Sequence, residues 1–175
     1  MKNCNTTPTP MSTDFHNSLG EDESEACDHE IYQSATGNIS YLSQWSRSDI
    51  VCAVSILSHF TAAPTQMYWM DVKRILRYLK GTVNLGLQIQ VSEELKLKCY
   101  VDSDCANDIK TRKSNSVIVI LFGGALIGWK SRKQTTVAIS TAVAEFIALS
   151  ELCSEITWYV QLLQVSALDF CCHIE

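Results

Sequence analysis

Apolar side chains recur at steps of three and four residues between positions 46 and 80, which is the period of amphipathic helices. A first run follows a capping serine at position 46 or 48, and its apolar stripe consists of Ile50, Val51, Val54, Leu57 and Phe60. Pro64 ends this run and opens a second one, which extends from about residue 65 to residue 80. One face of the second run carries Trp69, Val72, Leu76 and Leu79, and Gly81 follows as its C-cap. The pattern predicts two consecutive helices.

From residue 97 onward the hydrophobic period changes to two, which is typical of strands. Residues 97–101 alternate apolar and polar side chains. Two further apolar runs, 117–122 and 125–129, flank the pair Gly123-Gly124, which is the signature of a β-hairpin. The pattern therefore predicts three consecutive strands.

Beyond the hairpin the helical period returns. A long helix is predicted from Ser140 or Thr141, the expected caps, to about Gln164. Three consecutive strands followed by one long helix predict an α+β sheet that is covered on one face.

Composition narrows the class of protein. The chain has 175 residues, of which 46% are hydrophobic and 19% charged, so we expect a globular protein of one domain or of pieces of two. No apolar run approaches the roughly 18 residues that a membrane span needs, and the N-terminus lacks the apolar core of a secretory signal. Eight cysteines without a recurrent spacing indicate free buried thiols. We expect no membrane contact and an intracellular location, cytoplasmic or nuclear.

Charge is distributed unevenly along the chain. Residues 1–36 hold one basic residue against seven acids, residues 37–133 hold thirteen against seven, and the last 42 residues hold five acids and no base. Because residues 1–30 also carry few large apolar side chains, we expect a flexible acidic head without chemistry of its own. The basic middle is compatible with a phosphate-bearing partner, although charge alone favours a solvated surface.

A basic stripe on the second predicted helix consists of Lys73, Arg74, Arg77 and Lys80. Cations in the last turns of a helix offset its dipole, which is a structural role that needs no ligand. Four cations on one face can equally follow a phosphate backbone. The residues alone leave both interpretations open.

Two acids on neighbouring predicted elements are the clearest candidates for chemistry. Asp102 falls late in a strand, and Glu145 falls in the first or second turn of the long helix. Acids placed so can approach across a sheet edge and bind Mg²⁺ through oxygen. Two such ions about 4 Å apart would hold the attacking and leaving oxygens of a phosphodiester. The alternative is that both acids are ordinary exposed surface residues.

Several ordered motifs carry a resemblance to a known family. They read WMDVKRILRYLKGTVNLGL, YVDSDCAND, SRKQTTVAIST and AEFIALSE. With them, residues 31–163 resemble the end of the reverse-transcriptase region and the start of the ribonuclease H domain in Pol polyproteins of copia-type LTR retrotransposons.

The resemblance implies a fold and an activity. Residues 31–90 would be a helical segment like the reverse-transcriptase connection, and residues 96–175 a truncated ribonuclease H-like domain. The domain is expected to be an incomplete sheet of three mostly antiparallel strands with a long helix. Its ancestral reaction is Mg²⁺-dependent hydrolysis of the RNA strand in RNA:DNA hybrids. Expected partners are such a hybrid or another nucleic acid, and the remainder of a Pol polyprotein.

The resemblance also assigns site residues. Asp102 matches the first metal-binding Asp of the ribonuclease H site, Glu145 matches its Glu, and Asp104 matches the second acid of the Asp motif. A basic stretch of the family that contacts the hybrid backbone corresponds here to Lys130, Arg132, Lys133 and Gln134. The basic stripe belongs to the connection between polymerase and nuclease, which favours nucleic-acid contact or domain packing.

Departures from the family pattern bear on activity. Ser48 replaces a usual Pro, Cys105 a Trp, and Val143 the first Glu of a helix motif. Two of the four acids of such a site have no counterpart, and the third would lie on a strand after the long helix. We therefore expect an inactive or nearly inactive chain, with the strand at 97–101 and the long helix left partly uncovered. The alternatives are a non-catalytic nucleic-acid binder and an inert translated transposon remnant.

Overall fold

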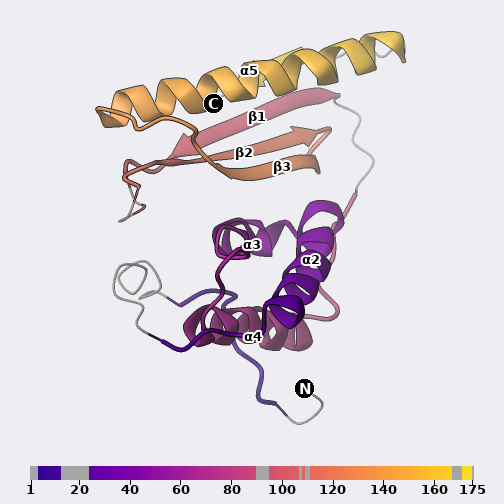
Figure 1. Cartoon of the computed structure of the whole chain (residues 1–175). Helices are drawn as coiled ribbons and strands as arrows, with labels where there is room; N and C mark the ends of the chain where they lie inside the picture. Colours follow the sequence, from indigo (N-terminus) through magenta and orange to yellow (C-terminus); the bar gives the residue numbers. More distant parts are fainter. Residues whose placement is uncertain are drawn as a thin grey trace. The chain divides into compact units, whose positions relative to one another are not determined.

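The computed structural model describes residues 4–12, 24–89, 95–106, 108, 111–166 and 171–174. The chain divides into two compact units (Figure 1). The helical unit comprises Met1–Gly86 with Asp108–Lys110, and the sheet unit comprises Leu87–Asn107 with Thr111–Glu175. No helix of the described residues is long and apolar enough to cross a membrane.

The helical unit contains helix α2 (His29–Trp45), the 3₁₀ turn η1 (Ser48–Ile50), α3 (Val51–Ser58) and α4 (Gln66–Gly81). Both helices predicted after residue 46 are confirmed, the first of them split into η1 and α3. Gly81 is the last residue of α4, and Thr82 takes the C-cap position that was predicted for Gly81.

Helix α2 has no counterpart in the predicted pattern. Its buried side consists of Tyr32, Thr36, Ile39 and Ser43. Because two of these four residues are polar, apolar residues do not recur at the helical period along this face. The hydroxyl of Thr36 donates to the carbonyl of Tyr32 at 2.8 Å, which satisfies it inside the core. Asp28 caps the helix through its carboxylate, which accepts from the backbone N–H of Ile31 at 3.1 Å.

The core of the helical unit lies where α2, α3 and α4 meet. The buried face of α4 carries Tyr68, Val72, Ile75 and Tyr78, and the predicted Trp69, Leu76 and Leu79 are only partly buried beside it. The buried face is rotated from the predicted one because Tyr68 and Tyr78 fill the space between the helices. The predicted apolar face did not include these tyrosines. Each large side chain buried here stabilises the unit by about 1.5–3 kcal/mol.

The sheet unit contains strands β1 (Lys96–Ser103), β2 (Asn115–Phe122), β3 (Ala125–Lys133) and β4 (Cys171–Ile174), with helix α5 (Thr141–Val165) between β3 and β4. The strand order is β3-β2-β1-β4. Neighbouring β1, β2 and β3 pair antiparallel, which confirms the predicted α+β class and the antiparallel strands. The fourth strand was not predicted, and it pairs parallel with β1.

Helix α5 covers one face of the sheet (Figure 1). Its buried stripe consists of Ala144, Ala148, Leu152, Ile156 and Leu163, and the sheet side of this core includes Leu97, Cys99, Ile118 and Ile120. Ser140 caps the helix as predicted, because its hydroxyl accepts from the backbone N–H of Val143 at 3.2 Å. The expectation of uncovered apolar faces is wrong for the strand, where Leu97 and Cys99 are buried, and it holds for part of α5, where Phe146, Trp158 and Val165 are exposed.

Candidate active site and nucleic-acid-binding residues

The structure brings the two candidate metal-binding acids to one cavity. Asp102 lies near the end of β1 and Glu145 in the second turn of α5, and both line a cavity of about 320 Å³. The remaining lining residues are Val101, Ala142, Phe146, Ala148 and Leu149. The cavity therefore has acidic side chains on largely apolar walls.

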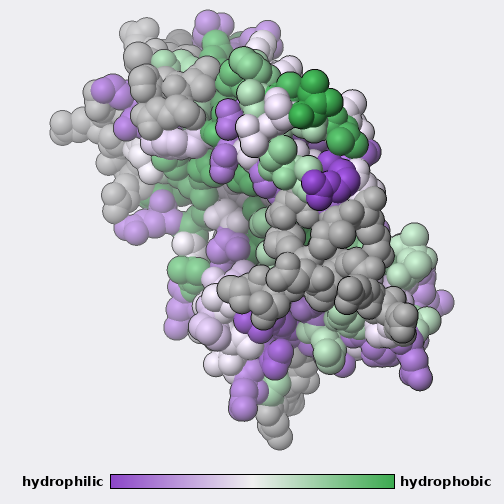
Figure 2. Space-filling view, turned by 90° about the vertical axis from the view of Figure 1, so that its left-hand side faces the viewer, coloured by the Kyte–Doolittle hydropathy of each residue, from purple (hydrophilic) through white to green (hydrophobic). Residues whose placement is uncertain are grey.

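The cavity lies beside an open part of the edge of β1. Val101 belongs to the alternating set that packs toward α5, so the strand period places Asp102 on the opposite face. Strand β4 pairs with β1 only along Lys96–Cys99 in the described residues, so the edge beyond Cys99 stays open on that side. Figure 1 shows the end of β1 beneath the first turns of α5. Figure 2 shows the left-hand side of the view in Figure 1. Hydrophobic and hydrophilic residues are mixed in the upper part of that surface.

The donor set suits one hard cation better than two. Carboxylate oxygens are the ligands that Mg²⁺ prefers, and the ion is commonly held by one or two carboxylates with waters and substrate phosphates. One oxygen of Asp102 accepts from the backbone N–H of Ser103 at 2.8 Å, which orients the carboxylate. Over the described part of the chain, no group of three or more His, Cys, Asp or Glu is placed to hold a metal. Two acids give too little negative charge for a pair of divalent ions.

Asp104, the second acid of the same motif, has a structural role. Its two carboxylate oxygens accept from the backbone N–H of Asn115 at 2.6 Å and from the Asn115 side-chain amide at 3.2 Å. The backbone N–H of Asp104 donates to the Asn115 carbonyl at 3.2 Å. These bonds join the end of β1 to the start of β2 and hold the chain next to Asp102.

The basic residues of β3 differ in how they are placed. Lys130 pairs with Glu155 of α5, with 2.6 Å between Nζ and Oε1. Arg132 is exposed and Lys133 is half-buried. The sequence prediction treated the three as one group, although the strand period sends Lys130 and Arg132 to the face that α5 covers and Lys133 to the other.

Gln134 does not lie on the surface as the prediction of a nucleic-acid contact required. It is 1% exposed, and its amide nitrogen donates to the Ser116 hydroxyl at 3.0 Å and to the Ala144 carbonyl at 2.9 Å. Gln134 thus joins the end of β3 to the first turn of α5, and we call this contact the clamp. Its partner in α5, Ala144, directly precedes Glu145. A buried glutamine between distant elements has no local sequence signal.

The basic stripe of α4 is partly engaged by the N-terminal segment. Lys73 is exposed and lies over the Trp69 ring, 5.2 Å from its centroid. Arg74 donates from Nη2 to the hydroxyl of Thr9 at 2.9 Å, and Lys80 donates from Nζ to the Cys4 carbonyl at 2.9 Å. The prediction of a nucleic-acid surface did not foresee these contacts, because they join residues more than sixty positions apart.

Known proteins resemble this chain over most of its length. It is 40% identical over 127 residues to secreted RxLR effector protein 161 of Plasmopara viticola, which covers 73% of this chain and 89% of that protein. It is 41% identical over 133 residues to the retrovirus-related Pol polyprotein from transposon TNT 1-94 of Nicotiana tabacum, covering 76% of this chain and 10% of the polyprotein. The corresponding polyprotein from transposon RE2 of Arabidopsis thaliana is 33% identical over 155 residues, 89% of this chain and 10% of that one.

This chain thus spans about a tenth of the length of the Pol polyproteins that it matches. No protein-family model matches it, and no solved structure matches it.

Proposed function

Because three quarters or more of this chain is similar to retrovirus-related Pol polyproteins from transposons, we propose that it is a fragment of such a polyprotein and that its sheet unit is a ribonuclease H-like domain that binds RNA:DNA hybrids. The reaction of the complete domain is hydrolysis of the RNA strand with Mg²⁺. The observation that carries the proposal is the cavity shared by Asp102 and Glu145, which are 43 positions apart in the sequence.

The strand topology supports the same proposal. In the family, the third acid of the site lies on the strand that follows the long helix. Here the strand after α5 is β4, and it lies parallel beside β1, the strand that carries Asp102. An acid on a strand in that position would face the same end of the sheet as Asp102.

The negative charges of Asp102 and Glu145 determine how a nucleic acid can approach the cavity. Because both acids line the same cavity, they repel a phosphodiester, so a hybrid backbone can approach the cavity only when a cation offsets their charge. A bound Mg²⁺ would supply Lewis-acid polarisation of the phosphate and activation of water. Arg132 and Lys133 would contact the backbone away from the cavity, where cations position nucleic acid without reading its sequence.

With two acids instead of four, cleavage by this chain is slow or absent, whereas weak cation binding and hybrid binding remain. The test uses the full chain, a labelled RNA:DNA hybrid, and Mn²⁺ as a calorimetric probe of the cavity. Asp102→Asn and Glu145→Gln should each abolish Mn²⁺ binding. Glu155→Gln is the matched control, because Glu155 is a carboxylate of the same helix that pairs with Lys130 outside the cavity.

Two outcomes would contradict parts of this proposal. Mn²⁺ binding that survives Asp102→Asn and Glu145→Gln would remove the cavity as a cation site. Rapid hybrid cleavage that Asp102→Asn abolishes would show that two acids suffice, and would overturn the proposed inactivity while keeping the site.

A second candidate function is nucleic-acid binding without catalysis. The exposed side chains of Lys73 and Arg132 favour it, since neither forms an ion pair with an acid of the described residues. Such binding should weaken steeply as salt rises, by about one unit of log–log slope for each phosphate contacted. An inert remnant of a transposon would bind neither Mn²⁺ nor the hybrid.

A further inference from the structure

Residues 4–12, here called the N-terminal strap, contact the basic stripe of α4. The hydroxyl of Thr9 accepts a hydrogen bond from Nη2 of Arg74 at 2.9 Å, and the hydroxyl of Thr7 donates to the carbonyl of Arg74 at 3.3 Å. At the other end of the stripe the Cys4 carbonyl accepts from Lys80 at 2.9 Å. The strap therefore follows about two turns of the helix.

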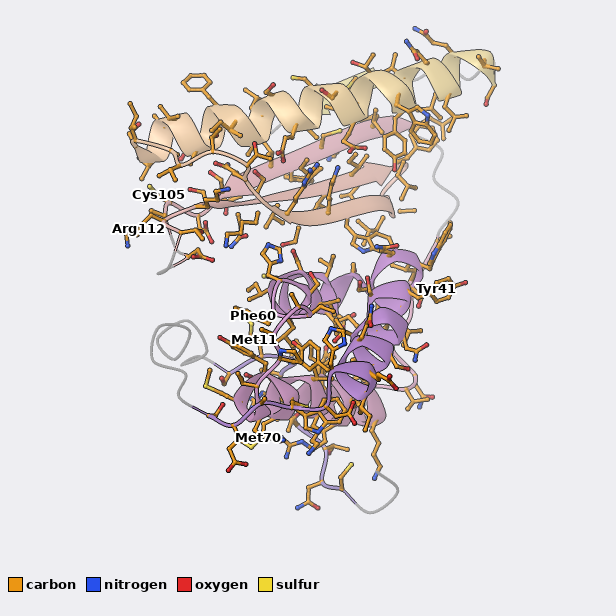
Figure 3. The ribbon with its side chains drawn as sticks, in the orientation of Figure 1. Met11, Tyr41, Phe60, Met70, Cys105 and Arg112 are labelled. Atoms are coloured by element: carbon orange, nitrogen blue, oxygen red, sulfur yellow. The ribbon has the colours of Figure 1, made fainter. Side chains whose placement is uncertain are left out.

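Packing holds the strap close to the helix as well. A Cβ atom built on Gly81 would lie 3.0 Å from Cβ of Thr6, so the two backbones approach closely at the end of α4. At the other end of the strap, Met11 packs against the core cluster of the helical unit, as Phe60 does (Figure 3). The N-terminal strap is therefore packed against the helical unit at both of its ends.

The strap meets the cations with neutral oxygen atoms. Between residues 4 and 12 the sequence has no acid, and the contacts with Arg74 and Lys80 use a hydroxyl and a carbonyl. The Nε atoms of Arg74 and Arg77 are buried without a hydrogen-bond partner among the described residues. Hydrogen bonds from a guanidinium or ammonium to phosphate are roughly twice as strong as those to neutral oxygen, so a phosphate backbone would bind this stripe better than the strap does.

We propose that the N-terminal strap is an intramolecular competitor that covers the basic stripe, and that nucleic acid displaces it on binding. This inference rests on the nucleic-acid binding proposed above and adds its regulation. Removal of the strap removes the hydrogen bonds that Thr9 and Cys4 make with Arg74 and Lys80, and cleavage of the chain after the strap would weaken them.

The direction in which hybrid affinity changes when the strap is deleted distinguishes competition by the strap from an effect of net charge alone. Deletion of residues 2–12 removes one positive charge, Lys2, and no negative charge. On charge alone the shortened chain should bind a hybrid more weakly. If the strap competes, the shortened chain should bind about five- to tenfold more tightly, with a salt slope steeper by about two because two cations are released.

The measurement is fluorescence anisotropy of a labelled RNA:DNA hybrid with the full chain and the shortened chain over a series of salt concentrations. Thr9→Val, which removes only the hydroxyl that Arg74 binds, should shift affinity in the same direction by a smaller factor. Thr157→Val is the matched control, because Thr157 is an exposed threonine of α5 whose hydroxyl bonds within its own helix. Equal affinity and equal slope for the full and shortened chains would overturn the competition.

A covalent lock tests the strap independently of deletion. Thr6→Cys combined with Gly81→Cys places two thiols at the point of closest approach, where a shift of a few tenths of an ångström reaches the Cβ separation of a disulfide. The oxidised double variant should bind the hybrid more weakly than either single variant, and reductant should restore binding. If no chain binds the hybrid, the proposed nucleic-acid function fails and the competition fails with it, whereas formation of the lock would still report the packing of the strap.

Discussion

Arg47 donates from Nε and Nη2 to the two carboxylate oxygens of Asp49, at 2.9 and 2.8 Å, in a bidentate pair two residues apart in the chain. The same guanidinium donates to the carbonyl of Thr82 at 3.1 Å and to its hydroxyl at 2.6 Å, and the Tyr78 hydroxyl donates to Asp49 at 2.7 Å. Burial alone would raise the pKa of Asp49, but the hydrogen bonds from Arg47 and Tyr78 lower it below its ordinary value. The network joins the turn before α3 to the end of α4.

Loss of Arg47 should therefore unfold the helical unit more easily. Arg47 is 7% exposed, and Arg47→Ala leaves the Thr82 carbonyl and the Asp49 carboxylate without a charged donor. We expect a loss of about 2–3 kcal/mol in the free energy of unfolding, somewhat less than for a fully buried pair. Urea denaturation followed by tryptophan fluorescence measures it. Arg132→Ala, on an exposed arginine, should cost less than about 0.5 kcal/mol, and equal effects of the two variants would contradict the role of the network.

Local signals predicted the sheet unit because each acts over a few residues. Gly123 and Gly124 both adopt positive φ, 55° and 81°, in the turn between β2 and β3, which glycine does without strain. Ser140 starts α5 by capping it, as its position before the apolar run predicted. These signals fixed the order of the strands along the chain and the long helix, and hence the two elements that carry Asp102 and Glu145.

Features that depend on distant residues were not predictable in this way. The apolar period did not predict helix α2, because Thr36 and Ser43 interrupt its buried face, although most of the helix lies in the segment 31–90 that the resemblance predicted to be helical. The four-residue strand β4 owes its pairing to β1, more than seventy positions earlier in the sequence. The clamp made by Gln134 depends in the same way on partners from other elements. The acidic pair was found from chemistry and resemblance, whereas its cavity follows from how α5 lies on the sheet.

Asp71 should make the helical unit less stable as pH rises. It is half-buried in α4, where burial raises its pKa from 3.8 to about 6, although the nearby Arg74 acts in the opposite direction. Because the pKa is higher in the folded chain than in the unfolded one, the folded state binds more protons between pH 4 and pH 6, and stability falls across that window. Asp71→Asn should stabilise the chain at pH 7 by about 1 kcal/mol, allowing for solvent screening, and have little effect near pH 4. Urea denaturation at a series of pH values tests this, and a gain independent of pH would contradict it.

Gln134 should hold the start of α5, and with it Glu145, against the sheet. Gln134→Leu keeps a similar volume but leaves the Ser116 hydroxyl and the Ala144 carbonyl without their donor, which we expect to cost about 1–3 kcal/mol. The variant should also weaken Mn²⁺ binding in the cavity, since Glu145 follows Ala144 directly. Gln164→Leu, at an exposed position near the end of the same helix, is the matched control and should change neither quantity. Unchanged stability of Gln134→Leu would show that the clamp is dispensable.

Cys99 should be the least reactive thiol of the described chain. The expectation that the cysteines are buried is correct for Cys99 but wrong for Cys52, Cys105, Cys153 and Cys172, which are exposed. Burial, with a smaller effect of the neighbouring Cys172 thiol, raises the pKa of Cys99 to about 11 from its ordinary value of 9.0. Its thiolate fraction at neutral pH is then about a hundredfold lower than at the ordinary pKa, and burial also limits access of a reagent, so alkylation of Cys99 should be slower than that of the exposed Cys105 and Cys153.

Timed alkylation with iodoacetamide and peptide mass spectrometry measures the rates at each cysteine. Denaturant should abolish the difference between Cys99 and the exposed thiols, and a rise in pH toward 11 should narrow it.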